Sequence, residues 1–285
     1  LPEFIRLFTG GNFPVGMVTV PMAGVLAAGN RAMIKPSEFT ERVANVFAEA
    51  VPKYFAEEEI AVFTGGVEVG TAFSKLAFDH LIFTGATGVG KHIMEQGAKT
   101  MKRVFLELGG KSAKIVLDDA ENFAMEVATT MLVFHAGQGC AVQSRLLVPK
   151  SRYAEAVGIL KHAYASFGEN WGEFDNPAHI MGPVVSKRQQ ERVMSYIQLG
   201  QDEGATLIAG GKMRPDKGSG YFIEPTCFAD VSNDMRIAQE EIFGPVLVVI
   251  PFEDDEDAIR IANDSDYGLG GGVASASLDR AMNVA

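Results

Sequence analysis

Residues 80–98 read HLIFTGATGVGKHIMEQGA, and they join a short apolar strand, a Gly-rich turn and a helix in succession. Residues 80–84 are short, apolar and rich in aromatic and β-branched side chains, as a buried strand is. Residues 89–98 show the apolar spacing of a helix. A turn that ends a strand and opens a helix presents free backbone N–H groups, which can bind a phosphate. The stretch therefore indicates an α/β fold with a candidate phosphate site at Gly85.

The same alternation of strand and helix extends through the first half of the chain. We expect strands at 31–35, 60–63 and 104–108 and a helix at about 40–54. Repeated strand–helix–strand units predict a parallel sheet that helices cover. Gly109-Gly110 then marks a hinge, so the sequence predicts one domain at 1–107 and a second at 108–285.

The second half keeps the α/β character. We expect helices at 121–134, 152–167, 186–203 and 255–263, strands at 112–117, 145–148, 207–209 and 246–251, and a loop or hairpin at 210–220. The acidic residues that open the last of these helices suit the positive end of a helix dipole.

Composition excludes several classes of function. The 285 residues are 47% hydrophobic and carry a formal net charge of −11 without a Lys/Arg-rich block, which excludes a surface that follows nucleic-acid phosphates. No apolar run approaches the roughly 20 residues of a membrane span, and residues 1–4 lack the pattern of a signal peptide. The two cysteines, Cys140 and Cys227, are too few for a disulfide scaffold or a self-sufficient zinc site. We therefore expect a cytoplasmic protein without a metal, a membrane partner or a nucleic-acid partner.

The Gly-rich turn nearly spells a nucleotide-binding P-loop, since Gly85, Gly90 and Lys91 have the right spacing. His92, however, stands where a Ser or Thr hydroxyl must bind magnesium, and imidazole is a poor ligand for that hard ion. The glycines also fall in the order G-x-x-G-x-G instead of the G-x-G-x-x-G of the dinucleotide fingerprint. By itself the turn is either a phosphate site or a plain tight turn, and an ATPase is the least favoured interpretation.

A cysteine follows a turn of small residues. Residues 134–140 read FHAGQGC, and the glycines on both sides of Gln138 leave room for a substrate beside the Cys140 thiol. A lone cysteine is more commonly a small buried hydrophobe. His135 suggests a Cys–His hydrolase, but that reaction needs a third residue to orient the imidazole, and no nearby residue has that character. Cys140 alone is therefore a candidate nucleophile and no more.

Glu107 lies between Leu106 and Leu108 at the end of an apolar run. A carboxylate in such surroundings is partly desolvated, which suits a general base. The simpler alternative is an edge-strand glutamate that faces solvent. Glu107 remains ambiguous until it is considered together with Cys140.

Glu107 and Cys140 belong to two segments, ELGGKS at 107–112 and GQGC at 137–140, which are followed by Arg145. Further segments accompany them: NFP at 12–14, LAAGN at 26–30, KPSE at 35–38, FTGAT at 83–87, EEIFGP at 240–245 and NDSDYGL at 263–269. This ordered set resembles the aldehyde dehydrogenase superfamily, and the resemblance extends from about residue 12 to the last residue.

The resemblance implies a Rossmann-type parallel-sheet cofactor domain, incomplete on its N-terminal side, plus an α/β catalytic domain. It implies that Cys140 is the nucleophile, which forms a thiohemiacetal and then a thioester with an aldehyde. Glu107 is implied to be the general base that activates water, and Asn12 is implied to bind the oxyanion together with the Cys140 N–H. The implied activity is the NAD(P)-dependent oxidation of an aldehyde to a carboxylic acid.

The resemblance further implies a nicotinamide cofactor site. Glu241 and Phe243 would contact the nicotinamide ribose and ring, and Lys35 and Glu38 the adenosine ribose. The complete implied set is Lys35, Ser37, Glu38, Gly65, Phe83, Thr84, Gly85, Thr87, Leu108, Glu241 and Phe243. A carboxylate at Glu38 accepts from a free ribose 2′-OH and repels a 2′-phosphate, so NAD is favoured over NADP. Relatives with the same KPSE string use either cofactor.

The chain departs from the family pattern in three ways. Gly10-Gly11 replaces the usual Pro-Trp before Asn12, which predicts a looser loop, Ala86 replaces a frequent Ser, and Pro21 replaces a Lys. Proline at that position resembles the branch of coniferyl-aldehyde and fatty-aldehyde dehydrogenases, and the stretches 78–83 and 90–94 resemble the coniferyl-aldehyde type. We therefore expect an aromatic or other bulky hydrophobic aldehyde as the substrate.

Members of the family are longer than this chain. By resemblance the chain lacks the first part of the cofactor domain, which would leave a sheet edge unpaired. It also lacks the final catalytic segment and the oligomerisation strand, and with that tail we expect a homodimer or homotetramer. Two alternatives to a hydrolytic dehydrogenase stay open. One is a catalytically silent member that serves as a structural or binding protein, and the other is a semialdehyde dehydrogenase that transfers its acyl group to coenzyme A.

Overall fold

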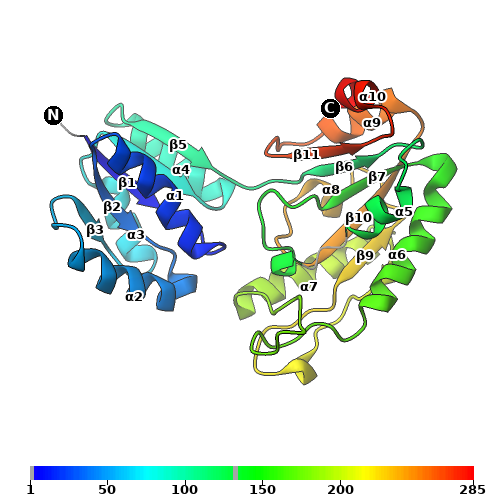
Figure 1. Ribbon diagram of the computed structural model, residues 1–285, viewed down its shortest axis with the longest axis horizontal. Helices are drawn as coiled ribbons and strands as arrows, with labels where there is room; N and C mark the ends of the chain where they lie inside the picture. The colour runs from blue at the N-terminus through cyan, green and yellow to red at the C-terminus, as the bar shows by residue number, and fades with distance from the viewer. Residues whose placement is uncertain (1–2, 131–133) are drawn as a thin grey trace. The chain divides into compact units, whose positions relative to one another are not determined.

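The computed structural model describes residues 3–130 and 134–285. The chain forms two compact units, Leu1–Gly109 and Gly110–Ala285, each with its own sheet (Figure 1). Two consecutive glycines span the boundary between the units, and glycine restricts the backbone less than any other residue.

The sheet of the first unit has five parallel strands in the order β3-β2-β1-β4-β5. Their bounds are Phe4–Phe8 for β1, Arg31–Lys35 for β2, Ile60–Val62 for β3, His80–Thr84 for β4 and Arg103–Glu107 for β5. The chain runs outward from β1 through β2 to β3 and then returns to β4 on the other side of β1. Such a reversal is the topological switch point of a doubly wound sheet, and ligands bind outside the carboxyl ends of the strands at that point.

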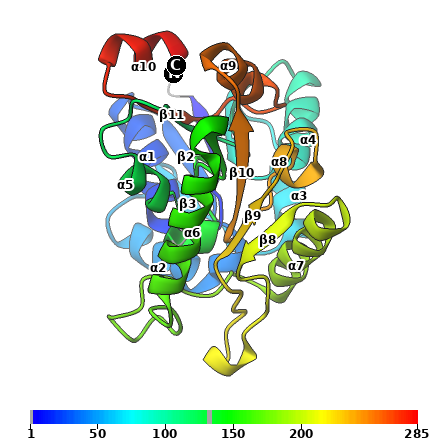
Figure 2. The same ribbon diagram turned by 90° about the vertical axis from the view of Figure 1, so that its right-hand side faces the viewer.

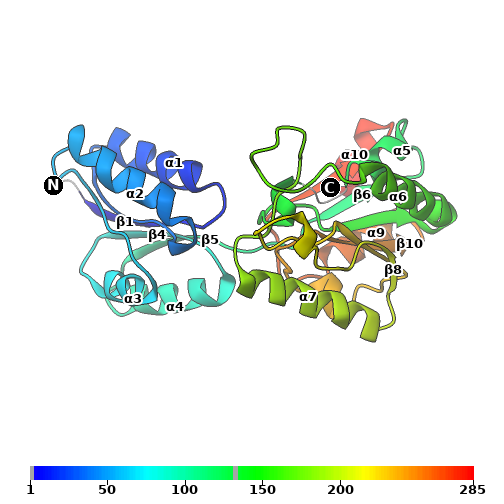
Figure 3. The ribbon, with the colours of Figure 1, turned by 90° about the horizontal axis from the view of Figure 1, so that it is seen from below.

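Helices cover both faces of this sheet. One face carries α1 (Pro14–Ala27) and α2 (Glu41–Ala50), and the other carries α3 (Val67–Lys75) and α4 (Thr87–Ala98) (Figure 3). The alternation of side chains along β1 explains this division. Ile5 and Leu7 pack with residues of α1, whereas Phe8 packs against Phe73 of α3.

The second unit contains a six-stranded mixed sheet in the order β11-β6-β7-β10-β9-β8. The bounds are Ala113–Val116 for β6, Arg145–Pro149 for β7, Thr206–Ala209 for β8, Thr226–Ala229 for β9, Val246–Phe252 for β10 and Gly271–Ala274 for β11. β8 runs antiparallel to β9, and the other neighbouring pairs are parallel. β10 is buried along most of its length, as expected of a strand that is covered on both faces.

Helices also cover both faces of the second sheet. One face carries α5 (Phe123–Ala128) and α6 (Tyr153–Phe167), and the other carries α7 (Lys187–Asp202), α8 (Arg236–Gln239) and α9 (Asp255–Asn263), with α10 (Leu278–Val284) beside α9. Figure 2 shows β8, β9 and β10 between α6 and α7. Successive residues of β10 divide between the two cores. Val248 and Ile250 pack on the side of α7, and Leu247 and Val249 pack on the side of α6.

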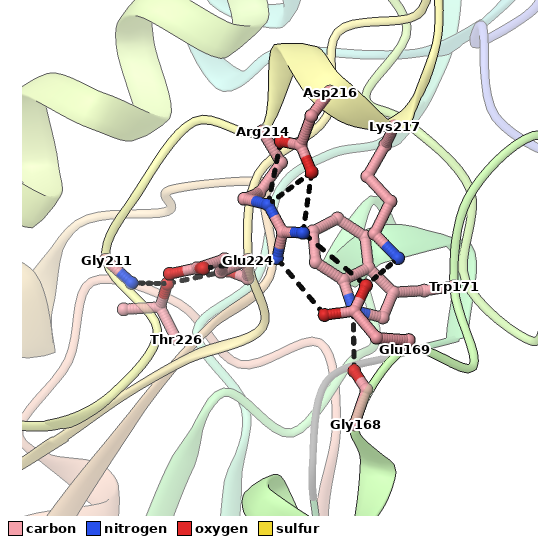
Figure 4. A network of polar contacts seen from close by, with 9 residues as sticks. All are labelled: Gly168, Glu169, Trp171, Gly211, Arg214, Asp216, Lys217, Glu224 and Thr226. Carbon is pink, nitrogen blue, oxygen red and sulfur yellow. Dashed lines mark hydrogen bonds and ion pairs between the residues drawn. The ribbon is translucent and has the colours of Figure 1, made fainter.

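The loop between β8 and β9 is held by charged groups around Trp171 (Figure 4). Arg214 pairs with Asp216 at 2.7 Å and with Glu169 at 3.4 Å, and Lys217 pairs with the same Glu169. The Arg214 guanidinium carbon also lies 5.4 Å from the centre of the Trp171 ring. The segment that the sequence predicts as a loop or hairpin is therefore an ordered loop with a 3₁₀ turn at Pro215–Lys217.

The predicted α/β class is confirmed. Each predicted strand is also present, with ends within two residues of those expected, and so are the predicted helices at 89–98, 152–167, 186–203 and 255–263. Two predicted helices are wrong in length. The one at 40–54 is divided, because Pro52 interrupts it, and the 3₁₀ turn Val51–Lys53 follows α2.

The predicted helix at 121–134 is also too long. α5 ends at Ala128, and residues 131–133 lie outside the described residues. Residues 134–137 form a non-helical turn, in which His135 and Ala136 both have a φ of 50°. The Thr129 hydroxyl donates to the Met125 carbonyl oxygen at 2.8 Å, and the Thr130 hydroxyl donates to that of Glu126 at 2.9 Å. These hydroxyls bind carbonyl oxygens that the backbone N–H groups of a longer helix would otherwise bind, so they compete with continuation of the helix.

Sequence patterns missed β1, β9, β11, α1, α3, α8 and α10. α1 is apolar almost all round and contains Pro21, so it lacks an amphipathic period. β1 carries a charge, Arg6, at a buried position, and β11 opens with Gly271-Gly272, which is untypical of a strand. Within the described residues, no helix has the length and apolar character that crossing a membrane requires.

Candidate active site

The loop after β1 brings Asn12 beside Thr84, the last residue of β4. A Cβ built on Gly10 would lie 3.0 Å from Asn12 Oδ1 and 3.5 Å from Thr84 Cγ2. Because β1 and β4 flank the switch point of the sheet, the Asn12 carboxamide lies where a doubly wound fold binds its ligands. Glycine at position 10 leaves the carboxamide the space that a larger residue would take.

Glu107 ends β5 directly beside Thr84, its partner in the register of the two strands. The Gly85 N–H donates to the Glu107 carbonyl oxygen at 3.0 Å, and Glu107 is half-buried. Because β5 is an edge strand of this sheet, the alternative of an edge-strand glutamate stays open. Asn12, Thr84, Gly85 and Glu107 all lie at the carboxyl edge of the first sheet.

Lys35 and Glu38 form an ion pair just after β2. Lys35 Nζ lies 2.9 Å from Glu38 Oε2, and the lysine side chain is buried whereas the glutamate side chain is 39% exposed. The Ser37 hydroxyl accepts from the Phe39 N–H at 3.3 Å and so shapes the turn that contains Glu38. The pair presents a donor and an acceptor together at the sheet edge, a combination that suits the hydroxyl groups of a ribose.

Two helices begin at this edge without a side-chain cap, α3 after Gly66 and α4 after Ala86. Gly65, which has a φ of 138°, makes the turn before α3 in a conformation that favours glycine. The Thr87 hydroxyl, at the start of α4, is buried and has no hydrogen-bond partner among the described residues. Uncapped N–H groups, a positive dipole end and an unpartnered hydroxyl fit a phosphate. These residues therefore fit the pyrophosphate of a dinucleotide.

Phe83 and Leu108 turn their side chains into the protein. Phe83 is buried in the core between β4 and the helices α3 and α4. Leu108 packs over Gly90, where an added Cβ would lie 2.4 Å from Leu108 Cδ2. At Phe83, only main-chain atoms are therefore available to a ligand at the sheet edge.

In the second unit, Cys140 lies half-buried in the loop that leads to β7. This loop packs tightly against two other segments. A Cβ on Gly110 would lie 2.3 Å from the Cys140 carbonyl oxygen, and a Cβ on Gly137 would lie 2.0 Å from the Gly244 carbonyl oxygen. Both contacts are with backbone, so both positions require glycine.

Gln138 connects the same loop by a hydrogen bond to the segment just before α7. Its side-chain carbonyl accepts from the Val185 N–H at 2.9 Å, and its amide donates to the His135 carbonyl oxygen at 3.0 Å. His135 has a φ of 50°, and its ring centre lies 4.5 Å from that of Phe134. The residues before Cys140 are thus held by groups of the same unit.

The second cysteine has a different environment. Cys227 lies within β9 and is fully buried, and burial raises the pKa of its thiol well above the usual range. A thiol that stays protonated is a poor nucleophile. Of the two cysteines, Cys140 is therefore the one suited to attack a substrate.

Glu241 is connected to Cys140 through one glycine. The Gly110 N–H donates to Glu241 Oε1 at 3.2 Å, and the Cys140 carbonyl oxygen packs against the same glycine. Burial raises the pKa of Glu241, while the Gly110 hydrogen bond and the charges of Arg192 and Lys111 oppose the shift. Phe243, two residues further on, has a φ of 58°, which costs a non-glycine residue roughly 1–2 kcal/mol.

Across the two units, the candidate residues supply a thiol, carboxylates, a carboxamide and an ammonium group. A thiol can attack a carbonyl carbon, a carboxylate can accept a proton from water, and an amide N–H can bind an oxyanion. Among residues 3–130 and 134–285, no group of three or more His, Cys, Asp or Glu side chains is placed to hold a metal ion.

The family model described as "Aldehyde dehydrogenase family" matches residues 5–285. The chain belongs to the aldehyde dehydrogenase family. It is 42% identical over 277 residues to the mitochondrial aldehyde dehydrogenase of Leishmania tarentolae, an alignment that covers 95% of this chain and 55% of the relative. It is 40% identical over 287 residues to the 3-succinoylsemialdehyde-pyridine dehydrogenase of a Pseudomonas species, covering 98% of this chain and 59% of the relative.

A solved structure supports the same assignment. The crystal structure of a Mycobacterium tuberculosis aldehyde dehydrogenase complexed with NAD+ matches with a TM-score of 0.93 and 39% identity, covering 99% of this chain and 58% of that one. The family predicted from the ordered motifs is therefore confirmed. The chain spans less than two thirds of the length of these aldehyde dehydrogenases.

Two residues of this aldehyde dehydrogenase chain lie in the quoted motifs, but the sequence assigned them no role. Lys111 is fully buried, and burial, with a contribution from the Arg145 charge, lowers its pKa to about 7. Arg145 donates to the Lys111 carbonyl oxygen at 2.8 Å and to the carbonyl oxygens of Ile261 and Ala262, in the last turn of α9, at 3.0 and 2.9 Å. Arg145 therefore joins the start of the second unit to α9.

Two further residues, Gln189 and Arg192 of α7, were missed altogether. Both donate to backbone carbonyl oxygens of the segment that contains Glu241 and Phe243. Nothing in the sequence marks such residues, because their partners are main-chain atoms far along the chain.

Proposed function

We propose that the protein oxidises an aldehyde to the carboxylic acid with NAD+ as hydride acceptor, through a thioester on Cys140. The observation that carries this proposal is the position of Gly110. Its N–H holds the Glu241 carboxylate, and the backbone of Cys140 packs against it. One glycine thus connects the candidate nucleophile to the candidate ligand of the nicotinamide ribose.

In the proposed reaction, the Cys140 thiolate attacks the aldehyde carbon, and the carbonyl oxygen becomes an alkoxide. The Asn12 carboxamide and the Cys140 N–H donate to that oxyanion. Hydride transfer from the same carbon, for which bound NAD+ would supply the acceptor, would leave a thioester on Cys140. Glu107 then takes a proton from water, and the hydroxide displaces the thiolate to release the acid.

Each unit carries residues that we propose as cofactor ligands. The Lys35–Glu38 pair is suited to the adenosine ribose, and the start of α4 with Thr87 is suited to the pyrophosphate. The Glu38 carboxylate would repel a 2′-phosphate, which favours NAD over NADP. Glu241 and Phe243 would contact the nicotinamide ribose and ring. In this proposal the first unit carries the residues for the adenosine ribose and the pyrophosphate, and the second unit carries the nucleophile and the residues for the nicotinamide ribose and ring.

For the substrate, we propose an aromatic or other bulky hydrophobic aldehyde. The name of the Pseudomonas relative describes an aldehyde with a pyridine ring, which supports this substrate class. Pro21, which lies inside α1, is a sequence feature that favours the same class of aldehyde. We further propose that the protein is cytoplasmic and that, with the C-terminal tail of the family, it forms a homodimer or homotetramer.

The test is NADH formation from NAD+ with a panel of aliphatic and aromatic aldehydes, compared among the natural chain, Cys140→Ala and Glu107→Gln. Both variants should lose turnover, the second by about 10²–10⁴-fold, the contribution typical of a general base. Mass spectrometry should find an acyl group on Cys140 in Glu107→Gln, because the thioester forms but is not hydrolysed. Cys227→Ala is the matched control, and it should keep the thiol chemistry.

Three outcomes would contradict this proposal. Turnover that persists in Cys140→Ala would exclude the thioester route. A folded natural chain that binds NAD+ but oxidises no aldehyde would favour the catalytically silent alternative. Acceleration by coenzyme A, with release of an acyl-coenzyme A, would indicate acyl transfer instead of hydrolysis.

A further inference from the structure

The segment 240–245, which contains Glu241 and Phe243, has no helix or strand of its own. The backbone carbonyl groups of such a segment need hydrogen-bond partners from elsewhere. Two side chains of α7 provide them. Gln189 Nε2 donates to the carbonyl oxygens of Ile242, at 3.1 Å, and Phe243, at 2.8 Å. Arg192 Nη2 donates to the carbonyl oxygen of Glu241 at 2.7 Å. Three consecutive carbonyl groups are thus held from one helix.

The geometry of α7 makes this possible. Gln189 and Arg192 are three residues apart, so they lie on the same side of the helix. The Ser186 hydroxyl caps the helix by accepting from the Gln189 N–H at 3.2 Å, which fixes the first turn. A Cβ on Gly244 would lie 2.3 Å from Val193 Cγ2. Any side chain at position 244 would therefore push the segment away from α7.

The hydrogen bonds also act on a strained residue. Phe243 has a φ of 58°, a left-handed conformation that persists in a non-glycine residue only when its surroundings impose it. Gln189 donates to the carbonyl groups of Phe243 and of the residue before it. Without these donors, the segment is free to relax to an ordinary backbone conformation, which would move the Glu241 carboxylate and the Phe243 ring together.

We propose that Gln189 and Arg192 are positioning residues that hold Glu241 and Phe243 in the conformation that binds the nicotinamide half of the cofactor. This inference rests on the proposed function, in which Glu241 and Phe243 contact the nicotinamide ribose and ring. The two α7 side chains act through the backbone of the segment, without a need to touch the cofactor themselves.

The neighbouring residue provides a matched control. Gln190 Nε2 also donates to a backbone carbonyl oxygen, that of Phe222, at 3.0 Å. Gln189→Met and Gln190→Met therefore remove the same kind of interaction from the same helix, and methionine preserves the length of the side chain. Arg192→Met removes the second donor, and Arg192→Lys keeps a cationic donor at that position.

The kinetic experiment measures KM for NAD+ and kcat for each variant of the purified chain. Gln189→Met should raise KM for NAD+ about tenfold, because two hydrogen bonds to the segment are lost. Gln190→Met should leave KM within about twofold of the natural value. Arg192→Met should also raise KM, and Arg192→Lys should restore most of the loss. An unchanged KM in Gln189→Met would overturn the inference.

A second measurement needs no cofactor. Amide hydrogen exchange of the peptide that covers 240–245 should be faster in Gln189→Met than in the natural chain, and unchanged in Gln190→Met. Equal exchange rates in all three proteins would overturn the inference. If the natural chain fails to bind NAD+ or to oxidise aldehydes, the proposed function fails, but faster exchange in Gln189→Met would still support the positioning contacts.

Discussion

Gly137 lies so close to Gly244 that a Cβ built on Gly137 would fall 2.0 Å from the Gly244 carbonyl oxygen. The contact is between two stretches of backbone, so no side-chain rotation can relieve it. It joins the loop that carries Cys140 to the segment that carries Glu241 and Phe243. The spacing between the candidate nucleophile and the candidate cofactor ligands in the second unit therefore depends on a position without a side chain.

Gly137→Ala should destabilise the second unit by about 1–3 kcal/mol, because it both overpacks the contact and places alanine at a φ of 69°. Gly158→Ala is the control, because Gly158 lies inside α6 and a Cβ built there has no other heavy atom within 4 Å. That change should stabilise the unit by about 0.5–1 kcal/mol. Urea unfolding followed by the fluorescence of Trp171, the single tryptophan, measures both effects. The prediction fails if Gly137→Ala unfolds at the same urea concentration as the natural chain.

The two cysteines should differ in reactivity. In the folded chain, iodoacetamide should modify Cys140 quickly and leave Cys227 unmodified, because Cys227 is fully buried and burial raises its pKa. Mass spectrometry of labelled peptides gives the site and the rate. Cys140→Ala should abolish the fast reaction, whereas Cys227→Ala should retain it. Fast labelling of Cys227 without denaturant would contradict its burial in β9.

Lys111 should make the stability of the protein depend on pH. Burial lowers the pKa of Lys111 to about 7 from its ordinary value of 10.5, so between these pH values the unfolded state binds more protons than the folded state. The free energy of unfolding should therefore rise with pH from about 7 to about 10.5, by at most about 1.4 kcal/mol per pH unit from this group.

The measured quantity for Lys111 is the difference in unfolding free energy between the natural chain and Lys111→Met at several pH values. This difference should shift in favour of the natural chain as pH rises. Gly158→Ala changes no titratable group, so its difference from the natural chain should stay constant. A constant difference for Lys111→Met as well would show that the buried amine does not titrate in this range.

Arg6 should weaken the first unit. Its guanidinium lies in the core, with the central carbon 3.8 Å from the centre of the Phe78 ring, and Nη1 donates to the Phe73 carbonyl oxygen. Nε and Nη2 are buried and have no hydrogen-bond partner in the described part of the chain. Burial lowers the pKa of Arg6 to about 10, which reflects the cost of a poorly paired charge.

Arg6→Met should therefore stabilise the first unit by about 1–3 kcal/mol, since replacement of a buried charge by an apolar side chain of similar length is commonly favourable. Arg103→Met removes an exposed cation paired with Glu3 and should change stability by less than about 1 kcal/mol. Urea unfolding followed by circular dichroism compares the two. Loss of stability in Arg6→Met would mean that the contacts with Phe73 and Phe78 outweigh the unpaired N–H groups.

The fold was predictable from sequence where apolar periodicity is strong. β4 and α9 have the predicted bounds, because a short β-branched run and an amphipathic helix each produce a clear pattern. β1 was not predictable, since Arg6 interrupts its apolar pattern, and the partners of this charge, two aromatic rings and the Phe73 carbonyl oxygen, come together only in the folded core. α1 was not predictable either, because a helix that is apolar all round carries no period.

The sequence by itself determined the family and the identity of the candidate nucleophile and base. Cys140 and Glu107 stand in short motifs whose order along the chain is visible without a structure. Only the tertiary structure decided which groups contact the backbone around Cys140 and along residues 241–243. Gly110, Gln189 and Arg192 act through hydrogen bonds and close contacts with backbone atoms of distant segments. Backbone atoms are the same in every residue, so a sequence carries no mark of contacts with them until the chain is folded.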